Sequence, residues 1–185
     1  MISTNPKSDF EGVTLWFTGL PCSGKSTISE IVFERLQRSR LKVELLDGDV
    51  VRQKLTKGLG FSKEDRDENI RRIAYVCHLL SRNGVIAIAA AISPYRGIRD
   101  ELRRMIPCFV EIYVHCPLEV CTRRDVKGMY KRALAGELKN FTGVSDPYEE
   151  PLHAELVLDT DQETPQQSAG KVLEYLRVRG WDVAP

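Results

Sequence analysis

Apolar residues along this chain gather in short runs, some of which contain one or two polar residues, and these runs alternate with longer stretches in which every third or fourth residue is apolar. The first pattern is typical of strands buried on both faces of a parallel sheet, and the second of amphipathic helices. The runs predict strands at 13–18, 42–46, 85–90, 109–114 and 156–158. Their alternation with helices predicts an α/β fold with a mostly parallel central sheet and helices on both faces.

Helical spacing and cap signals predict the segments between these strands. Ser62 followed by Asp65 has the Ser-x-x-Asp form of a helix start, and apolar residues then recur at helical spacing to about Arg82. The other expected helices lie at 26–38, near 49–56, at about 97–105, from Pro117 onward and around 169–176.

Residues 124–150 show no sustained period and are rich in Lys, Arg, Gly and aromatic residues. We expect a locally basic lid there, because a long loop inside a compact domain is usually functional. No internal repeat or low-complexity linker divides the chain. We therefore expect residues 1–185 to form a single domain, with a flexible segment at 1–11.

The bulk composition argues against several classes of protein. A chain of 185 residues with 42% hydrophobic residues suits one globular domain with a full core. Lys and Arg total 27 against 26 Asp and Glu, so no overall positive field favours nucleic acid or an anionic membrane. The longest apolar stretch, 85–92, is too short to span a bilayer. Five scattered cysteines, with no C-x-x-C pair and no preceding signal peptide, favour a reducing, cytoplasmic setting.

A glycine-rich loop pattern lies between the first predicted strand and the helix after it. It matches G-x-x-x-x-G-K-[ST] at every fixed position and comprises Gly19, Leu20, Pro21, Cys22, Ser23, Gly24, Lys25 and Ser26, with Thr27 after it. The glycines let backbone N–H groups point at phosphate oxygens, and the helix N-terminus adds partial positive charge. Lys25 suits the β- and γ-phosphates of a nucleotide, and the Ser26 hydroxyl suits Mg²⁺. The loop predicts a site for ATP or GTP; the alternative is a glycine-rich turn with a surface lysine.

Other motifs narrow the class of nucleotide-binding protein. The chain lacks the N-K-x-D motif of a GTPase and the apolar run ending in Asp-Glu of a motor-type ATPase. Asp47 and Asp49 follow the second predicted strand, and Ser93 follows the third, at the end of the strands where parallel sheets bind ligands. The short length, the basic lid and the acidic pair together favour a small-molecule kinase.

Several further motifs follow in the chain. In order they are Leu46-Asp47-Gly48-Asp49 with Arg52, Gly60-Phe61-Ser62 with Asp65-Arg66, Glu68-Asn69-Ile70-Arg71-Arg72, Ile92-Ser93-Pro94-Tyr95-Arg96, Lys127-Gly128, Lys139-Asn140-Phe141-Thr142-Gly143 and Asp146-Pro147-Tyr148-Glu149. Together they resemble the motifs of the adenylylsulfate (APS) kinases. The resemblance covers roughly Gly12 to Leu158.

The resemblance implies a three-layer P-loop NTPase fold and a reaction. ATP, with Mg²⁺, would phosphorylate the 3′-hydroxyl of adenosine 5′-phosphosulfate (APS), which gives 3′-phosphoadenosine 5′-phosphosulfate. The resemblance further implies a homodimer and a functional link to ATP sulfurylase, the enzyme that makes APS.

The candidate catalytic residues are Asp49, Lys25 and Ser93. The Asp49 carboxylate would orient the attacking hydroxyl and accept its proton, while Asp47 would hold the Mg²⁺ shell through water. The alternative is that this acidic pair caps the following helix. Ser93 matches a serine that some members of the family are proposed to phosphorylate transiently; otherwise its hydroxyl, or the backbone at Ile92 and Ser93, would contact substrate.

The APS site needs forked cations and a flat apolar surface, because APS carries a phosphosulfate anion and an adenine. By their family positions, the candidates are Arg52, Arg66, Asn69, Phe61, Phe141, Lys127 and Lys139, together with Asp47, Asp49, Ile92 and Ser93. The two phenylalanines are expected to stack on the adenine of APS, and Arg124 on that of ATP. For each arginine and lysine the alternative is a solvated surface charge.

The chain departs from the family pattern at Pro21 and Cys22, where Ser or Gly is frequent, and at Val50, His115 and Val126. Because proline has no N–H, position 21 is not expected to cradle phosphate. Two other interpretations stay open. One is a kinase of the same architecture that acts on a sugar acid or a nucleoside, and the other is a nucleotide-dependent regulatory module without activity.

Overall fold

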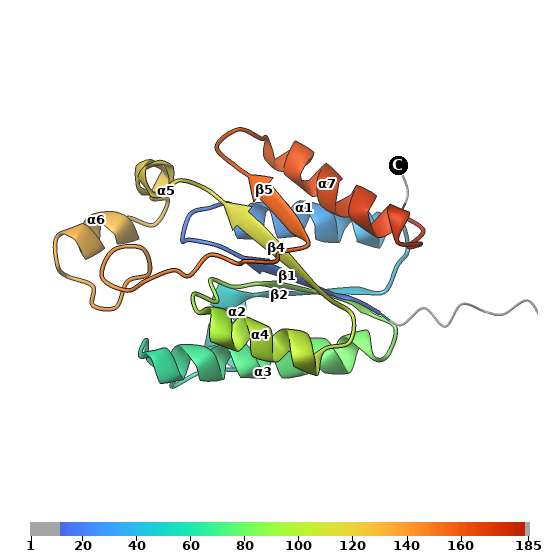
Figure 1. Cartoon of the computed structure of the whole chain (residues 1–185), viewed down its shortest axis with the longest axis horizontal. Coiled ribbons are helices and arrows are strands. Elements are labelled where there is room, and N and C mark those ends of the chain that lie inside the picture. The colour runs from blue at the N-terminus through green and yellow to red at the C-terminus, as the bar shows by residue number, and fades with distance from the viewer. Residues whose placement is uncertain (1–11, 184–185) are drawn as a thin grey trace, which may run out of the picture.

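A five-stranded, all-parallel sheet forms the centre of the structure, a computed structural model that describes residues 12–183 (Figure 1). The strand order is β2-β3-β1-β4-β5. The strands are β1 (Thr14–Thr18), β2 (Val43–Asp47), β3 (Ile86–Ala90), β4 (Phe109–His115) and β5 (Leu156–Asp159). In the central strand, Thr14 pairs with Ala87 of β3 on one side and with Phe109 of β4 on the other. The expected strands and their parallel arrangement are confirmed.

Helices cover both faces of the sheet, which gives three layers (Figure 1). One face carries α1 (Lys25–Arg38) and α7 (Pro165–Val178), and the other carries α2 (Gly48–Lys54), α3 (Lys63–Ser81) and α4 (Arg96–Met105). Two short helices, α5 (Leu118–Arg124) and α6 (Met129–Leu134), lie beyond one end of the sheet. This arrangement confirms the predicted three-layer α/β fold.

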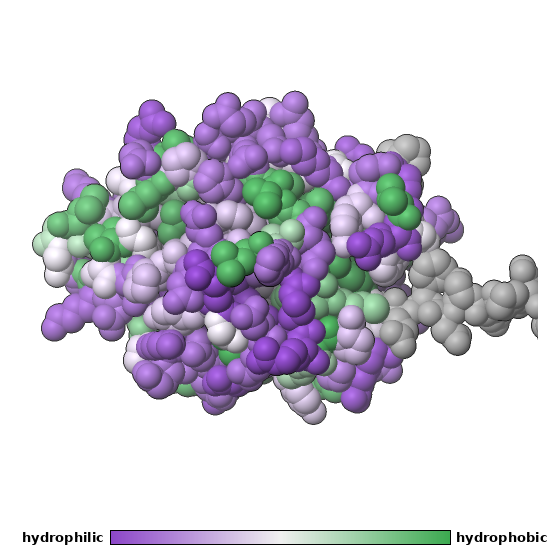
Figure 2. Space-filling model, viewed as in Figure 1, coloured by the Kyte–Doolittle hydropathy of each residue, from purple (hydrophilic) through white to green (hydrophobic). Residues whose placement is uncertain are grey.

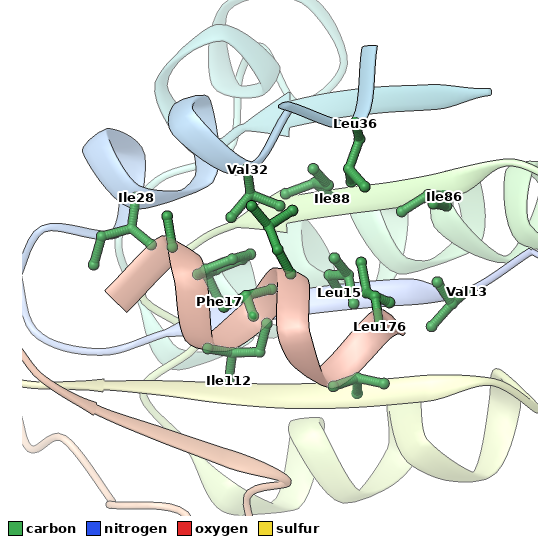
Figure 3. Packing of buried hydrophobic residues seen from close by; sticks show 14 of the residues in the cluster. Val13, Leu15, Phe17, Ile28, Val32, Leu36, Ile86, Ile88, Ile112 and Leu176 are labelled. Atoms are coloured by element: carbon green, nitrogen blue, oxygen red, sulfur yellow. The ribbon is translucent and has the colours of Figure 1, made fainter. Parts of the chain in front are cut away.

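Alternate side chains of β1 fill the cores on the two faces of the sheet. Leu15 and Phe17 share a cluster with Val32 and Leu36 of α1 (Figure 3), whereas Trp16 belongs to the cluster beneath α3 and α4. Successive side chains of a strand point to opposite faces, so a strand covered on both sides is largely apolar. For this reason the mainly apolar runs identify the strands.

The sequence pattern missed one helix, α6, inside the predicted lid. Its six residues are too few for an apolar period to show. Gly128 precedes it in the left-handed conformation, and the Asp125 carboxylate accepts hydrogen bonds from the N–H groups of Tyr130 (2.9 Å) and Lys131 (3.0 Å). These bonds satisfy donors that the first turn of a helix leaves without partners.

The loops that follow the strands meet at one edge of the sheet, because the carboxyl ends of parallel strands lie together. Residues 19–24 follow β1, Asp47 ends β2, residues 91–95 follow β3, and Thr160 follows β5. Helices α5 and α6 extend beyond this same edge (Figure 1). The candidate functional groups of the sequence are thereby collected on one side of the molecule.

The face of the molecule shown in Figure 2 is mostly hydrophilic, with separate apolar patches. Several exposed apolar side chains lie in or near α5 and α6, namely Leu118, Val126, Leu134 and Val144. Across residues 12–183, no helix combines the length and the apolar composition that crossing a bilayer requires.

Truncation of a core side chain tests the packing of α1 on the sheet. Leu36 is fully buried in the cluster beneath α1 and α7. We expect Leu36→Ala to lower the free energy of unfolding by about 3 kcal/mol, through lost apolar burial and the cavity left behind. Urea unfolding followed by circular dichroism measures this change. The control Leu134→Ala removes an exposed side chain and should cost less than about 0.5 kcal/mol. Equal losses in the two variants would contradict this packing.

Candidate active site

The loop after β1 has a backbone that favours glycine at two of its positions. Gly19 has a φ of 150° and Gly24 a φ of 105°. A Cβ on Gly19 would lie 2.5 Å from the carbonyl oxygen of Val114. Helix α1 begins at Lys25, directly after Gly24, so the N-terminal N–H groups of the helix adjoin the loop. The predicted phosphate loop therefore has the backbone shape and the helix N-terminus that suit an anion.

Side chains hold several carbonyl groups of this loop. Lys25 Nζ donates hydrogen bonds to the carbonyls of Gly19 (3.0 Å) and Leu20 (2.7 Å). The hydroxyl of Tyr130, in α6, donates to the carbonyl of Pro21 (3.1 Å). Pro21 has no N–H to offer a phosphate, but its carbonyl joins the loop to the lid.

Arg124, at the end of α5, and Thr160, directly after β5, brace the loop. The Thr160 hydroxyl donates to the carbonyl of Ser23 (2.8 Å), and Arg124 donates to the hydroxyl (3.1 Å) and to the carbonyl (2.5 Å) of Thr160. A longer contact joins Arg124 to the Ser23 carbonyl (3.4 Å). Arg124 thus lies beside the phosphate loop, with its guanidinium bound to the backbone. Its expected stacking on adenine stays a prediction.

Oxygen atoms that suit Mg²⁺ lie beside the loop. Ser26, in the first turn of α1, donates from its hydroxyl to Asp47 Oδ2 at the end of β2 (2.8 Å). Mg²⁺ prefers oxygen ligands, keeps several waters and needs only one or two protein carboxylates, so this pair fits the predicted metal site. Asp49 lies in the first turn of α2, but its side chain is outside the described part of the structure. Its role as a base stays a prediction.

Arg52, Phe61 and Arg66 form one cluster, which joins α2 to the start of α3. The guanidinium carbon of Arg52 lies 4.3 Å from the centroid of the Phe61 ring, and that of Arg66 lies 5.7 Å from it. Phe61 is 57% exposed, so an aromatic ring beside two cations is open to solvent. This combination suits a ligand that carries both a flat base and an anionic group. The structure brings together three residues that the sequence assigned to one site.

Arg66 connects this cluster to the lid. The buried guanidinium donates to the carbonyl of Phe61 (3.0 Å), to the hydroxyl of Thr142 (3.1 Å) and to the carbonyl of Asn140. The carboxylate of Asp146 lies 3.7 Å from Arg66 Nε. Residues 140–146 therefore dock on α3 through one side chain.

The remaining candidates for the predicted APS site differ in how far they are exposed to solvent. Asn69 is buried, and its amide oxygen accepts a hydrogen bond from the Thr56 hydroxyl (2.8 Å). Phe141 is 9% exposed and packs edge-on against Tyr130, with ring centroids 5.0 Å apart. The exposed candidates on the lid are Lys127 and Lys139. The roles of all four toward a substrate stay predictions.

Ser93 is held by hydrogen bonds inside the protein. It is 1% exposed, and its hydroxyl oxygen accepts the indole N–H of Trp16 (3.0 Å). Its φ of 46° lies in the left-handed region, which a serine adopts at an energetic cost. The neighbouring Ile92 carbonyl accepts a hydrogen bond from the Thr18 hydroxyl (2.7 Å). The Ser93 hydroxyl is thus buried and hydrogen-bonded, and its role in the reaction stays a prediction.

Several polar residues at this edge were not predicted as part of the site. Tyr95 donates to Asp146 (2.9 Å). Burial, together with this bond, raises the pKa of Tyr95 to about 12, so its hydroxyl stays a donor at neutral pH. Thr18 ends β1 and Thr160 follows β5, and that position at a strand's carboxyl end was the signal that could have identified them.

These features together define a class of protein. A phosphate loop follows β1, a carboxylate at the end of β2 accepts a hydrogen bond from the loop serine, and a segment rich in Lys and Arg extends beyond the same edge, as in P-loop kinases. Comparison with known families then specifies the class further. The family profile described as adenylylsulphate kinase matches residues 11–159, and the chain belongs to this family.

Known relatives match nearly the whole chain. The adenylyl-sulfate kinase of Picosynechococcus sp. is 59% identical over 173 residues, which cover 94% of this chain and 98% of the relative. The solved APS kinase CysC of Mycobacterium tuberculosis, in complex with AMPPNP and APS, is 38% identical, with a TM-score of 0.87 over 90% of this chain and 98% of that one. The hexameric APS kinase from Thiobacillus denitrificans is 36% identical, with a TM-score of 0.71 over 92% of this chain and 29% of that one. The resemblance indicated by the motifs is confirmed.

Removal of one brace tests the support of the phosphate loop. Thr160→Val keeps the shape of the side chain and removes the hydroxyl that binds the Ser23 carbonyl. We expect the affinity for AMPPNP with Mg²⁺ to fall about fivefold, which corresponds to the roughly 1 kcal/mol contributed by one hydrogen bond. Titration calorimetry measures this affinity. The control Thr122→Val removes a hydroxyl that bonds within its own helix and should leave the affinity unchanged. An unchanged affinity in Thr160→Val would contradict the bracing role.

Proposed function

We propose that this chain transfers the γ-phosphoryl group of ATP to the 3′-hydroxyl of adenosine 5′-phosphosulfate, which gives ADP and 3′-phosphoadenosine 5′-phosphosulfate. The observation that carries the proposal is the arrangement around β2. Asp47 ends this strand and bonds to the loop serine Ser26, and α2, which carries Arg52 of the aromatic cluster, begins at the next residue. A phosphate loop and an acceptor cluster are thus neighbours, and membership of the adenylylsulphate kinase family supports their assignment.

The donor half would bind the phosphates of ATP. Backbone N–H groups of residues 19–24 and of the first turn of α1 would contact the phosphate oxygens, with the Lys25 ammonium beside them. Ser26 and Asp47 would hold Mg²⁺, which when bound neutralises charge on the β- and γ-phosphates. The AMPPNP in the M. tuberculosis relative supports a donor of the ATP type.

The acceptor half would recognise an adenine and a phosphosulfate. Phe61 offers an exposed ring for stacking, and Arg52 and Arg66 supply fixed cations beside it. Arg66 also bonds to Asn140 and Thr142, so the acceptor site and the lid share one cation. The APS bound in the M. tuberculosis relative supports this acceptor.

The transfer itself is an in-line displacement. Asp49 is assigned to orient the 3′-hydroxyl and to accept its proton. The 3′-oxygen forms a bond to the γ-phosphorus as the bond from that phosphorus to the β-phosphate oxygen breaks, and ADP leaves. The burial of Ser93 and its bond to Trp16 support direct transfer without a phosphoserine. A closed lid would exclude the water that competes with the 3′-hydroxyl.

The proposed substrate implies a cellular setting. APS must be supplied by an enzyme that joins sulfate to an adenylyl group, and this supports the functional link to ATP sulfurylase. The homodimer rests on the family resemblance. A reducing, cytoplasmic location is supported by the five cysteines, which are odd in number and scattered along the sequence.

Replacement of Asp49 tests the assigned base. We expect Asp49→Ala to lower kcat by about 1,000-fold, because the 3′-hydroxyl loses the group that orients it and takes its proton. The Kd for AMPPNP should change by less than about twofold, because the phosphate loop is untouched. Purified protein is incubated with ATP, Mg²⁺ and APS, and the 3′-phosphorylated product is separated and counted.

The control for this experiment is Asp100→Ala, which removes an exposed carboxylate of α4 and should keep the wild-type rate. A wild-type rate in Asp49→Ala would refute the base. Folded wild-type protein that phosphorylates another acceptor but not APS would refute the proposed function.

Replacement of Ser93 distinguishes direct transfer from a covalent route. We expect Ser93→Ala to keep kcat within about tenfold of the wild type, because direct transfer needs no enzyme nucleophile. The same product assay measures kcat, and mass spectrometry of wild-type protein incubated with ATP alone looks for a phosphorylated Ser93. Turnover reduced to background in the variant, together with phosphate on wild-type Ser93, would contradict direct transfer.

A further inference from the structure

We propose that Arg99 is a positioning residue for this reaction, which acts through the segments that it binds. It fastens residues 148–150, the lid root, to residues 92–94, the acceptor loop, and Glu111 holds it in place. The inference rests on the proposed function and adds a residue that motif comparison did not assign. Arg99 is a charged residue on the buried face of α4, beside Ile98 and Leu102, where an apolar side chain is expected.

Each nitrogen of the Arg99 guanidinium contacts a different segment of the chain. Nε donates to Glu111 Oε1 in β4 (2.7 Å), Nη1 donates to the Ser93 carbonyl in the acceptor loop (2.5 Å), and Nη2 donates to the Glu149 carbonyl in the lid root (2.5 Å). The side chain is 2% exposed. A planar fork with donors in three directions can serve three fixed acceptors at once, and a single ammonium cannot.

Further hydrogen bonds join the lid root to the acceptor loop. The N–H of Glu149 donates to the Pro94 carbonyl (2.8 Å). The hydroxyl of Tyr148 lies 2.9 Å from that of Thr18, which in turn donates to the Ile92 carbonyl (2.7 Å). The two segments are far apart in the sequence, yet these bonds and Arg99 hold them as one unit. A displacement of either segment therefore moves the other.

The charges around Arg99 are balanced. Glu111 is buried and accepts from Arg99 on one oxygen and from Arg103 on the other (3.1 Å), and Arg103 also pairs with Glu155. A buried ion pair adds little net stability, because the cost of desolvating two charges offsets their attraction. Stability alone therefore does not account for these four charges. The guanidinium of Arg99 is explained by its hydrogen bonds to two loops. The Glu111 carboxylate is explained by its neutralisation of that guanidinium.

The lid root leads to the acceptor side of the site. Asp146, just before the lid root, accepts from Tyr95 (2.9 Å) and lies 3.7 Å from Arg66, a candidate for binding APS. The donor loop has its own support from Thr160. A change at Arg99 should therefore disturb APS binding and lid closure, and leave the ATP site in place.

The test compares Arg99→Lys with the matched control Arg38→Lys, a substitution in an exposed ion pair on α1. Lysine keeps the charge but has one nitrogen for three acceptors. We expect Arg99→Lys to raise KM for APS and to lower kcat, each at least about tenfold, because the acceptor is no longer held in line. Its Kd for AMPPNP should stay within about twofold of the wild type. Arg38→Lys should match the wild type in all three quantities.

Trp16 supplies a second measurement that needs no turnover. Its indole N–H bonds to Ser93 in the acceptor loop, and the chain's other tryptophan is Trp181. In a Trp181→Phe background, we expect Arg99→Lys to shift the emission maximum of Trp16 and to speed limited proteolysis within residues 124–150. The control Arg38→Lys in the same background should change neither.

The outcomes separate this inference from the proposed function. A wild-type KM for APS in Arg99→Lys, with unchanged Trp16 emission, would overturn the role of Arg99. Equal losses of affinity for APS and for AMPPNP would also overturn it, because that result indicates a general structural defect. If Arg99→Lys does not fold, Glu111→Gln decides: we expect the same pattern at smaller amplitude, and wild-type values would overturn the proposal. If wild-type protein makes no product from APS, the proposed function fails, while Trp16 emission and proteolysis still test the hold of Arg99 on the two segments.

Discussion

The parallel pairing of β1 with β3 and β4 is the constraint on which the site depends. This register carries the loops after β1 and β3 to the same edge, where the Thr18 hydroxyl and the Gly19 N–H both reach the Ile92 carbonyl (2.7 and 3.5 Å). A slip of one residue would turn each side chain of β1 to the opposite face. The hydrogen bond of Trp16 to Ser93 would then be lost, and so would the bond of Thr18 to the Ile92 carbonyl. Apolar side chains of β1 would still fill both cores.

The two halves of the candidate site are built by different means. On the donor side, backbone conformation dominates, with positive φ at Gly19 and Gly24 and side chains that bind the loop's carbonyls. On the acceptor side, side-chain forks such as Arg66 and Arg99 join segments that are distant in the sequence. The donor loop is therefore recognisable as a local pattern, whereas the acceptor side exists only once the tertiary structure has formed.

This difference explains how much of the structure could be predicted. The strands and the phosphate loop follow from local signals, because burial on both faces demands apolar runs and the loop demands glycines. The short helix α6 gave no such signal, and the position of Thr160 after a strand did not show which distant groups its hydroxyl binds. The surroundings of Ser93 depend on Trp16, 77 residues away, so no window of sequence could show that its hydroxyl is buried and occupied. The pairing of Arg99 with Glu111 likewise depends on how α4 packs against β4.

The strand order has a consequence for how the chain acquires its structure. β1 is synthesised early, yet both of its hydrogen-bonded neighbours lie far downstream, at Ile86–Ala90 and Phe109–His115. Pairings between distant segments form slowly, because a long stretch of chain must first be closed into a loop. The motif that is easiest to recognise in the sequence thus depends on pairings with segments that are synthesised much later. On a ribosome, the loop after β1 can be held from both sides only when the chain has emerged past residue 115.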